Sequence, residues 1–353
     1  MKAASCFAAG SRFFDGMPSG FRRQTSHEVC TFSKNGKEIQ GRGRIGKRQA
    51  KNCAECKGAA GAFEIFRAKA GGTAVIRFTK MQGLGNDYIY INAFEERVDD
   101  PAALAKKISD RHFGVGSDGL VLIAPSETAD FRMVMYNADG SRGAMCGNAA
   151  RCVAKYVYDR GMTQKTVIEL QTDSGIKTLH LTVRDGVTQS VCVDMGEPIL
   201  ECERVPCLLG HGLVKKAPIT VLGRTFEITP ISMGNPHGVI FIDEPVEQFE
   251  LDKYGPELEH HPAFPEKVNI EFVNVLSPTR LRMRVWERGS GITLACGTGS
   301  CAVLAAASLC GLSDRRAEIV LDGGVLQDEW NEKTGHVLMT GAAAFVFNGE
   351  YDG

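Results

Sequence analysis

Two short segments of this chain repeat one pattern, in which a cysteine and a glycine precede a run of small residues. Met145-Cys-Gly-Asn-Ala-Ala-Arg151 is the first segment, and Ala295-Cys-Gly-Thr-Gly-Ser-Cys301 follows 150 residues later. The similarity extends outward at the same spacing: Arg132-Met133 aligns with Arg282-Met283, Tyr136 with Trp286, and Gly161 with Gly311. The chain is therefore predicted to consist of two similar halves, and each half presents one cysteine at the same position.

Hydrophobic periodicity predicts that strands dominate both halves, with one long helix in each. Strands are predicted at 75–81, 87–91, 120–123, 131–136, 225–231, 239–242 and 281–286, and helices at 101–111, 146–158 and 298–309. The last helix is apolar on every face, so it must be buried on all sides. Antiparallel strands around it would supply that burial. The predicted fold class is α+β, with two pseudo-symmetric halves, each a central helix wrapped by antiparallel β-strands.

Charge marks a further boundary in the chain. Residues 1–74 carry 14 Lys or Arg against 5 Asp or Glu, whereas the remaining residues carry 27 against 37. Because this first segment has no sustained hydrophobic period, it is predicted to be a basic, disordered extension. We assign residues 75–191 to the first half, completed by a C-terminal strand near 342–350, and residues 192–341 to the second half.

Several roles compete for the extension. Its basic composition is typical of a transit peptide or of a nucleic-acid-binding arm, although its acidic residues fit a transit peptide poorly. His27, Cys30, Cys53 and Cys56 have a possible zinc-ligand spacing, but such short spacings alone are weak evidence. An inert extension or an incorrectly assigned start of the chain is favoured. We expect a cytoplasmic protein with reduced thiols, and a plastid protein only if residues 1–72 are a transit peptide. No apolar run approaches the ~20 residues of a membrane span.

Each repeated cysteine is predicted to stand at the start of a helix. The free N–H groups and the dipole of a helix start lower the pKa of a thiol there, and the same amides can hold a carboxylate. Gly147 and Gly297 would let a ligand approach the backbone closely. Two facing helix starts would therefore clamp one carboxylate with a sulfur on each side of its α-carbon. One sulfur, as thiolate, would remove the α-proton, and the other would protonate the opposite face.

Other activities could use some of the same residues. Gly114-Val-Gly-Ser-Asp-Gly119 fits a dinucleotide-binding motif, but it follows a predicted helix and precedes a strand, which is the wrong order. His237 and Cys296 could form the pair of a cysteine hydrolase, which would leave Cys146 without a role. A non-enzymatic binding module would need neither thiol. Cys152 and Cys301 are out of register with the repeat, so they are assigned to the core, as are Cys192, Cys202 and Cys310.

Further motifs accompany the two cysteine segments. They are Lys80-Met-Gln-Gly-Leu-Gly-Asn-Asp87, Tyr136-Asn-Ala-Asp-Gly-Ser141, Met233-Gly-Asn-Pro-His237, Val268-Asn269 and Glu287-Arg-Gly-Ser-Gly291. With these motifs the chain resembles the diaminopimelate epimerases, a family of pyridoxal-independent amino-acid epimerases, over roughly residues 76–350. The resemblance implies the two-half fold predicted above. It also implies interconversion of LL- and meso-2,6-diaminopimelate, for lysine and peptidoglycan synthesis, by two cysteines without a cofactor.

The resemblance also implies a role for particular residues. Cys146 and Cys296 would be the bases, and the amides of Gly147-Asn148 and Gly297-Thr298 would hold the reacting carboxylate. The implied substrate-binding residues are Asn86, Asn137, Asn235, Asn269 and Arg288, with Glu287 at the distal ammonium and His237 near the sulfurs. Turn formation by the asparagines and a solvated Glu287–Arg288 pair are the alternatives. The implied partner is a small molecule, with no metal, nucleic acid or membrane, and a homodimer is considered.

The chain departs from the family pattern at a few positions. Ala149 stands where many members have glycine, and Gly119 stands where some have a glutamine in the active-site wall, so that role is not transferred. Proline and hydroxyproline racemases are the runner-up, but they usually have histidine where this chain has Asn148, and they would not need Glu287 or Arg288 at a distal end. Phenazine-type isomerases of the same fold replace the cysteines and fit less well.

Overall fold

The computed structural model describes the backbone of residues 30–34 and 37–41 and both backbone and side chains of residues 75–352. In the first region, β1 (Cys30–Lys34) and β2 (Lys37–Gly41) form an antiparallel pair, where the sequence predicted no strand. His27, Cys53 and Cys56 lie outside the described residues, and the side chain of Cys30 is not described. The transit-peptide, nucleic-acid-arm and zinc hypotheses therefore remain predictions.

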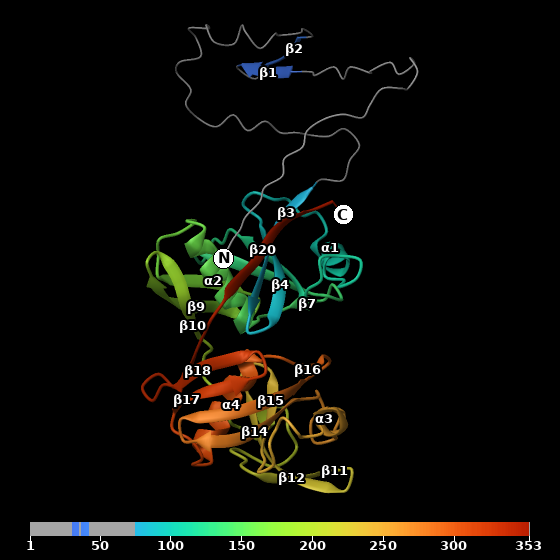
Figure 1. Ribbon diagram of the computed structural model, residues 1–353, viewed down its shortest axis with the longest axis vertical. Helices are drawn as coiled ribbons and strands as arrows, with labels where there is room; N and C mark the ends of the chain where they lie inside the picture. Colours follow the sequence, from blue (N-terminus) through green and yellow to red (C-terminus); the bar gives the residue numbers. More distant parts are fainter. Residues whose placement is uncertain (1–29, 35–36, 42–74, 353) are drawn as a thin grey trace, which may run out of the picture. The chain divides into compact units, whose positions relative to one another are not determined.

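The first half begins with two strands that form a hairpin. Its elements are β3 (Ile76–Gly83), β4 (Asn86–Asn92), α1 (Pro101–Ile108), β5 (Gly119–Ala124), β6 (Phe131–Asn137), β7 (Arg142–Gly143), α2 (Gly147–Asp159), β8 (Val167–Thr172), β9 (Gly175–Arg184) and β10 (Val187–Asp194). The last strand of the chain, β20 (Ala344–Tyr351), pairs with β3 and lies beside it (Figure 1).

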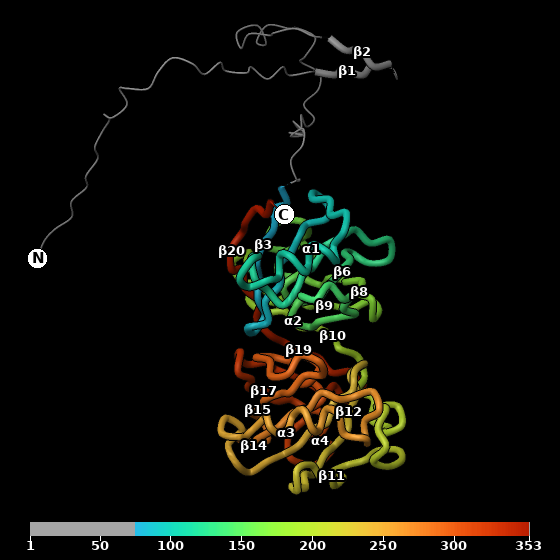
Figure 2. The backbone as a smooth tube through the Cα atoms, turned by 90° about the vertical axis from the view of Figure 1, so that its right-hand side faces the viewer, coloured from blue at the N-terminus to red at the C-terminus, as the bar shows by residue number. Residues whose placement is uncertain are grey.

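The second half repeats this order of elements. They are η2 (Cys202–Arg204), β11 (Ala217–Val221), β12 (Arg224–Ser232), β13 (Pro236–Phe241), α3 (Leu251–Glu259), β14 (Asn269–Ser277), β15 (Arg280–Glu287), β16 (Gly291–Thr293), α4 (Gly297–Leu309), β17 (Arg316–Leu321), β18 (Gly324–Trp330) and β19 (Val337–Gly341). Figure 2 shows the two halves as separate bodies of strands, with α2 in one and α4 in the other.

The strands pair in the same order in both halves. In the first, β20, β3, β4, β5, β6, β8, β9 and β10 are successive neighbours, and in the second β11, β12, β13, β14, β15, β17, β18 and β19 are. Most pairs are antiparallel, as predicted, but β4–β5 and β6–β8 are parallel, and so are their counterparts β13–β14 and β15–β17. The pairing of β10 with β19 joins the two halves. The two-half α+β fold is therefore confirmed, with parallel pairs that the sequence did not predict.

The two central helices have the predicted positions and burial. Both α2 and α4 contain 13 residues, and residues 302–307 of α4 are fully buried because this helix has no polar face. Gly161 and Gly311 follow the helices with φ of 72° and 70°, so both take the left-handed conformation typical of a helix end.

The helices α1 and α3 differ from the prediction. Helix α1 ends at Ile108, before the predicted end, because the carbonyl of Ile108 accepts hydrogen bonds from the N–H groups of Val115 and Gly116 in the following loop. Helix α3 was not predicted, and it contains an internal proline, Pro256. Burial of Leu251, Tyr254 and Leu258 stabilises this short helix through tertiary contacts, which a local pattern does not report.

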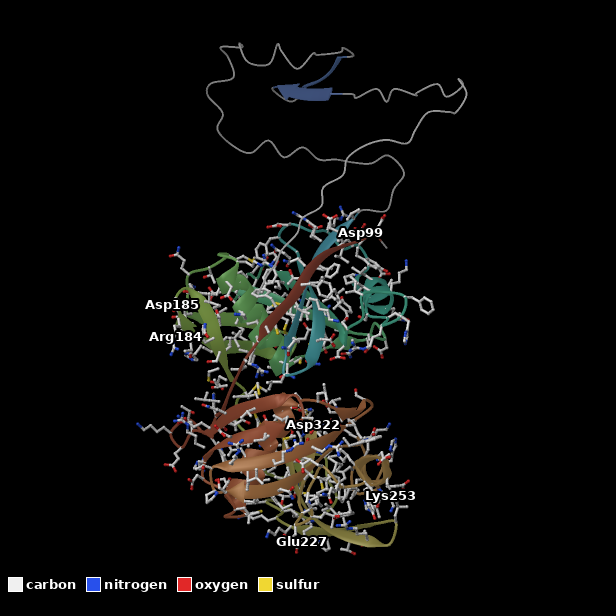
Figure 3. The ribbon with its side chains drawn as sticks, viewed as in Figure 1. Asp99, Arg184, Asp185, Glu227, Lys253 and Asp322 are labelled. Carbon is white, nitrogen blue, oxygen red and sulfur yellow. The ribbon has the colours of Figure 1, made fainter. Side chains whose placement is uncertain are left out.

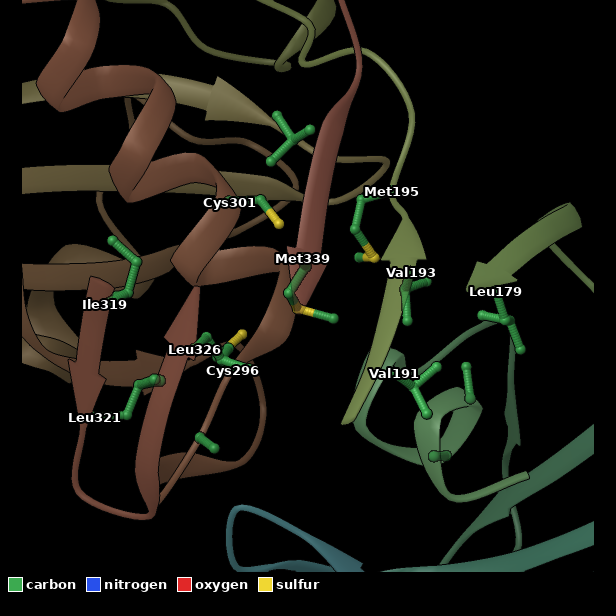
Figure 4. Close-up of a cluster of buried hydrophobic side chains, with 14 of the residues drawn as sticks. Leu179, Val191, Val193, Met195, Cys296, Cys301, Ile319, Leu321, Leu326 and Met339 are labelled. Carbon is green, nitrogen blue, oxygen red and sulfur yellow. The ribbon is translucent and has the colours of Figure 1, made fainter. Parts of the chain in front are cut away.

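One hydrophobic core cluster extends through both halves. It includes most of α2 and α4 and residues of the strands around them, such as Leu179, Val193 and Met339. Figure 4 shows Met339 between the α4 side chains and those of β10. Charged side chains such as Arg184, Asp185 and Lys253 point outward (Figure 3). Among the described helices, none is long and apolar enough to cross a membrane.

Candidate active site

Each repeated cysteine is the residue immediately before a central helix. Cys146 and Cys296 have extended backbone conformations, with φ of −137° and −119°, and their carbonyls accept the first helical hydrogen bonds, from Ala150 and Ser300. They therefore occupy the N-cap positions of α2 and α4, as the sequence predicted. The unsatisfied N–H groups of each helix start lie next to a sulfur.

The two helix starts lie against each other in the structure. The side-chain amide of Asn148 in α2 donates to the carbonyl of Ala295, the residue before Cys296, over 3.4 Å. Both helix starts also contact Met339 of β19: a Cβ added to Gly147 would lie 2.6 Å from its Cε, and one added to Gly297 would lie 3.0 Å from its Sδ. A side chain at either place would displace the end of this methionine, so the two glycines let it pack against both helix starts.

The sulfur of Cys146 lies among groups of the first half. Its Sγ is 3.3 Å from Oδ1 of Asn86, whose Nδ2 donates to Asp118 over 2.8 Å. Burial raises the pKa of the Cys146 thiol, whereas the amides of Asn148 and Ala149 lower it, and the carboxylate of Glu287 raises it further. Glu287 belongs to the second half, so an acidic group of that half acts on the thiol of the first.

The sulfur of Cys296 is more deeply buried, with 5% of the residue exposed. It accepts a hydrogen bond from the N–H of Gly299 over 3.4 Å and lies 3.6 Å from the hydroxyl of Thr298. Burial raises the pKa of this thiol well above its usual value, and the carboxylates of Glu287 and Glu271 add to the rise. The amides at each helix start lower the thiol pKa as expected, but burial and acidic neighbours outweigh them, so the pKa of both thiols is raised.

A histidine and two acidic residues border the Cys296 side of the site. His237 is fully buried, with Nδ1 2.7 Å from Oε1 of Glu271 and Nε2 3.2 Å from Oδ1 of Asn235. Asn235 in turn donates to the hydroxyl of Thr298 over 3.3 Å. Burial raises the pKa of the Glu287 carboxyl, whose oxygen accepts a hydrogen bond from Thr293. The structure thus brings His237, Asn235, Thr298 and Glu287 to the same cysteine.

The remaining predicted site residues have partners within the protein. Asn137 donates to the hydroxyl of Ser141 over 2.9 Å. Asn269 is 3% exposed; its Nδ2 donates to the carbonyl of Pro236 over 2.8 Å, and its Oδ1 accepts from the N–H of Arg288 over 2.9 Å. The exposed guanidinium of Arg288 donates to the carbonyl of Glu266 over 3.0 Å. Asn269 therefore positions the backbone of Arg288.

Three buried charged residues near the site were not predicted from the sequence. Arg151, Glu271 and Asp328 are each 0% exposed. Arg151 was noted only as part of a motif, and the two acidic residues stand at buried positions of β14 and β18. For these two acidic residues, an ionisable residue at an inward position of a strand is the signal that could have identified them.

Comparison with known proteins assigns the chain to a family. The family model described as diaminopimelate epimerase matches residues 78–201 and 229–346. A curated diaminopimelate epimerase of Acetivibrio thermocellus is 58% identical over 277 residues, which cover 78% of this chain and 99% of that protein. One of Methanococcus maripaludis is 53% identical over 277 residues, covering 78% of this chain and all of the relative.

The chain belongs to the diaminopimelate epimerase family. It is an amino-acid epimerase, and the matched region contains both cysteine segments and the residues around them. The resemblance stated from the sequence motifs is therefore confirmed.

Solved structures share the fold at low sequence identity. A hydroxyproline epimerase of Agrobacterium vitis with bound trans-4-hydroxy-L-proline has a TM-score of 0.56 at 16% identity, covering 80% of this chain and 92% of that one. A phenazine biosynthesis protein of the PhzF family from Bacillus anthracis has a TM-score of 0.57 at 15% identity, covering 79% and 99%. At this identity the likeness establishes the fold and does not distinguish the epimerase from its structural neighbours. Within residues 75–352, no group of three or more His, Cys, Asp or Glu side chains could hold a metal ion.

Proposed function

We propose that this protein converts LL-2,6-diaminopimelate to the meso form in lysine and peptidoglycan precursor synthesis, by a two-base reaction between Cys146 and Cys296. The observation that carries the proposal is that the N-cap thiols of α2 and α4 lie at adjoining helix starts and both respond to the charge of Glu287. Relatives named diaminopimelate epimerase, more than half identical over nearly their whole length, support the choice of substrate.

In the proposed reaction, one sulfur enters as thiolate and takes the α-proton of the substrate as its carbon–hydrogen bond breaks. The resulting negative charge spreads into the adjacent carboxylate, which the amides of Gly147-Asn148 and Gly297-Thr298 stabilise. The other sulfur enters as thiol and gives its proton to the opposite face of the carbon. The configuration inverts, and the two sulfurs have exchanged protonation states. No cofactor is required for this exchange.

The raised thiol pKa values suit such a reaction. An α-proton is held tightly, so the sulfur that removes it must be a strong base, and a thiolate with a raised pKa is more basic than an ordinary one. Glu287 and Glu271 raise the pKa of Cys296, and a substrate ammonium would compensate their charge. We assign Glu287 to the distal ammonium and Arg288 to the distal carboxylate, because a guanidinium can bind a carboxylate in a bidentate manner.

The other predicted substrate-binding residues keep their proposed roles at the site. Asn86 lies within hydrogen-bond distance of the Cys146 sulfur. Asn235 lies within hydrogen-bond distance of the Thr298 hydroxyl, which in turn is close to the Cys296 sulfur. Asn137 and Asn269 are proposed to bind the substrate and His237 to lie near the sulfurs, and each is held by bonds to neighbouring protein groups. We place the protein in the cytoplasm, because the eight cysteines among the described residues are all unpaired.

The proposal is tested by incubating the purified protein with LL-2,6-diaminopimelate in deuterated water. Solvent deuterium should appear at one α-carbon as meso product accumulates. Cys146→Ala and Cys296→Ala should each lower the rate by about 10²–10⁴-fold, the usual effect of losing an acid or base. Cys192→Ala is the control, because this thiol lies in β10 outside the site. Turnover of L-proline with no reaction of diaminopimelate would instead favour the racemase alternative.

A further inference from the structure

A buried guanidinium lies where the two halves of the molecule meet. Arg151 of α2 is 0% exposed and is the largest fully buried side chain of the described residues. Its Nε donates to the carbonyl of Ala342 over 3.2 Å, and its Nη1 lies 3.8 Å from the sulfur of Met339. A Cβ added to Gly341 would lie 3.0 Å from Nε, and one added to Gly83 would lie 3.2 Å from Nη2. Two glycines thus make room for this side chain.

The third contact of this guanidinium reaches the catalytic helix starts. Nη2 of Arg151 donates to Oδ1 of Asn148 over 2.8 Å. Since this contact occupies the oxygen end of the amide, the nitrogen end faces away and donates to the carbonyl of Ala295 over 3.4 Å. Asn148 follows Cys146 by two positions, and Ala295 immediately precedes Cys296. Arg151 and Asn148 therefore connect the segments that carry the two thiols.

A buried carboxylate accompanies the guanidinium from the other half. Asp328 of β18 is 0% exposed, and neither of its oxygens has a hydrogen-bond partner. It pairs in the sheet with Met339, whose sulfur contacts Arg151. Burial raises the pKa of Asp328 to about 7, against the opposing influence of the Ser300 hydroxyl and of Arg151. Asp328 and Arg151 thus both lie beside Met339 at the junction of the halves.

The internal repeat shows that neither charge is needed for the fold of a half. The counterpart of Arg151 in α4 is Cys301, because α2 and α4 start 150 residues apart. The counterpart of Asp328 in β9 is Leu179, because β9 and β18 start at Gly175 and Gly324. Both counterparts are fully buried. The first half thus has an arginine where the second has a cysteine, and the second half has an aspartate where the first has a leucine. Both ionisable residues lie at the same junction.

We propose that Arg151 is a positioning residue that sets the spacing of the Cys146 and Cys296 sulfurs through Asn148. The inference rests on the proposed two-thiol reaction, because only such a reaction requires both sulfurs to be held on one carbon.

The test uses four variants of the full chain and compares their kcat, their rate of disulfide formation and their stability. Arg151→Met should lower kcat for diaminopimelate epimerisation by about 10²-fold with little change in KM, because a misplacement of about 1 Å has this effect on a reacting group. It should also slow the oxidant-driven formation of a Cys146–Cys296 disulfide by about tenfold, since that bond requires the same proximity. Thiol titration follows the second reaction without substrate.

The matched control is Lys155→Met, the removal of another buried cation of α2. Lys155 donates to the carbonyl of Thr188 and to Asp159, both over 2.7 Å, and neither contact belongs to the cysteine segments. This variant should lose stability but keep the wild-type kcat and disulfide rate. A loss of activity equal to that of Arg151→Met would overturn the positioning role.

The remaining variants separate the role of Arg151 from that of Asp328. Asp328→Leu removes the other buried ionisable residue of this junction but leaves the contact of Arg151 with Asn148 in place, so it should keep the wild-type kcat and disulfide rate. The double variant Arg151→Met/Asp328→Leu should keep the low kcat and the slow disulfide formation of Arg151→Met. Recovery of both rates in Arg151→Met/Asp328→Leu, or loss of either rate in Asp328→Leu alone, would contradict the proposal. So would a wild-type protein that forms no such disulfide. If the wild type epimerises no diaminopimelate, the proposed substrate is wrong, whereas the disulfide rates still test the role of Arg151.

Discussion

At the scale of single residues, the two thiols share a helix-start geometry but differ in their surroundings. Cys146 contacts the amide side chain of Asn86 and has two backbone amides nearby, whereas Cys296 has two carboxylates as neighbours. Glu287 raises the pKa of both. A group that neutralises the charge of Glu287 should therefore lower the pKa of both thiols.

Glu287→Gln tests this coupling. Removing a nearby negative charge favours the thiolate, so the pKa of Cys146 and of Cys296 should both fall. At a fixed pH below those pKa values, alkylation by iodoacetamide should become faster at both sulfurs, as measured by mass spectrometry over a pH series. Glu257→Gln in α3 is the control, because this exposed acid is not among the groups that shift either thiol. Alkylation profiles that coincide with those of the wild type would show that Glu287 does not act on the sulfurs.

At the scale of elements, the starts of α2 and α4 follow the same design with one difference. The third position after the cysteine is Ala149 in α2 and Gly299 in α4. A Cβ added to Gly299 would lie 2.7 Å from Oε1 of Glu271 and 3.2 Å from the sulfur of Cys296. The start of α4 is therefore more tightly packed, because it holds both an acidic side chain and a thiol against its backbone.

Gly299→Ala should weaken both activity and stability. Alanine favours a helix interior by about 1 kcal/mol over glycine, but overpacking a buried site costs about 1–3 kcal/mol, so the clash should dominate. The kcat should fall because the sulfur of Cys296 must move. Steady-state kinetics and urea unfolding measure the two effects. The reciprocal change, Ala149→Gly, should cost about 1 kcal/mol at most and reduce kcat much less. Equal losses in the two variants would refute the distinction.

At the scale of the whole molecule, the two halves share one hydrophobic core, and two ionisable residues, Arg151 and Asp328, are buried at their junction. The core cluster contains residues from α2, α4 and the strands around both. Asp328 lies at this junction with its pKa raised to about 7 by burial. An acidic group with such a shift retains its proton in the folded protein at pH values where the unfolded chain has already lost it.

The stability that depends on Asp328 should therefore fall as the pH rises. Between the ordinary pKa near 4 and the folded pKa of about 7, the folded state binds more protons than the unfolded state, so its free energy of unfolding decreases. Each pKa unit corresponds to about 1.4 kcal/mol. Asp328→Asn cannot ionise, so the unfolding free energy of wild type minus that of the variant should decrease between pH 5 and pH 8, taken as roughly the limits of this window. Urea unfolding across that range checks it, and a constant difference would contradict the shifted pKa.

The sequence by itself determined the duplication, the two N-cap cysteines, the buried central helices and the family. These features depend on local patterns: an apolar helix without a polar face, glycines with positive φ at the helix ends, and motifs of a few residues. Such patterns arise from residues that are close together in the sequence, so the order of the residues is enough to reveal them.

Only the tertiary structure decided the electrostatics of the site and the parallel strand pairs. Helix starts lower thiol pKa values, but burial and the carboxylates of Glu271 and Glu287 reverse the direction. The link from Arg151 through Asn148 to Ala295 joins residues that are far apart in sequence. Dehydration and long-range contacts arise only when the core is assembled, because they depend on which distant segments exclude water together.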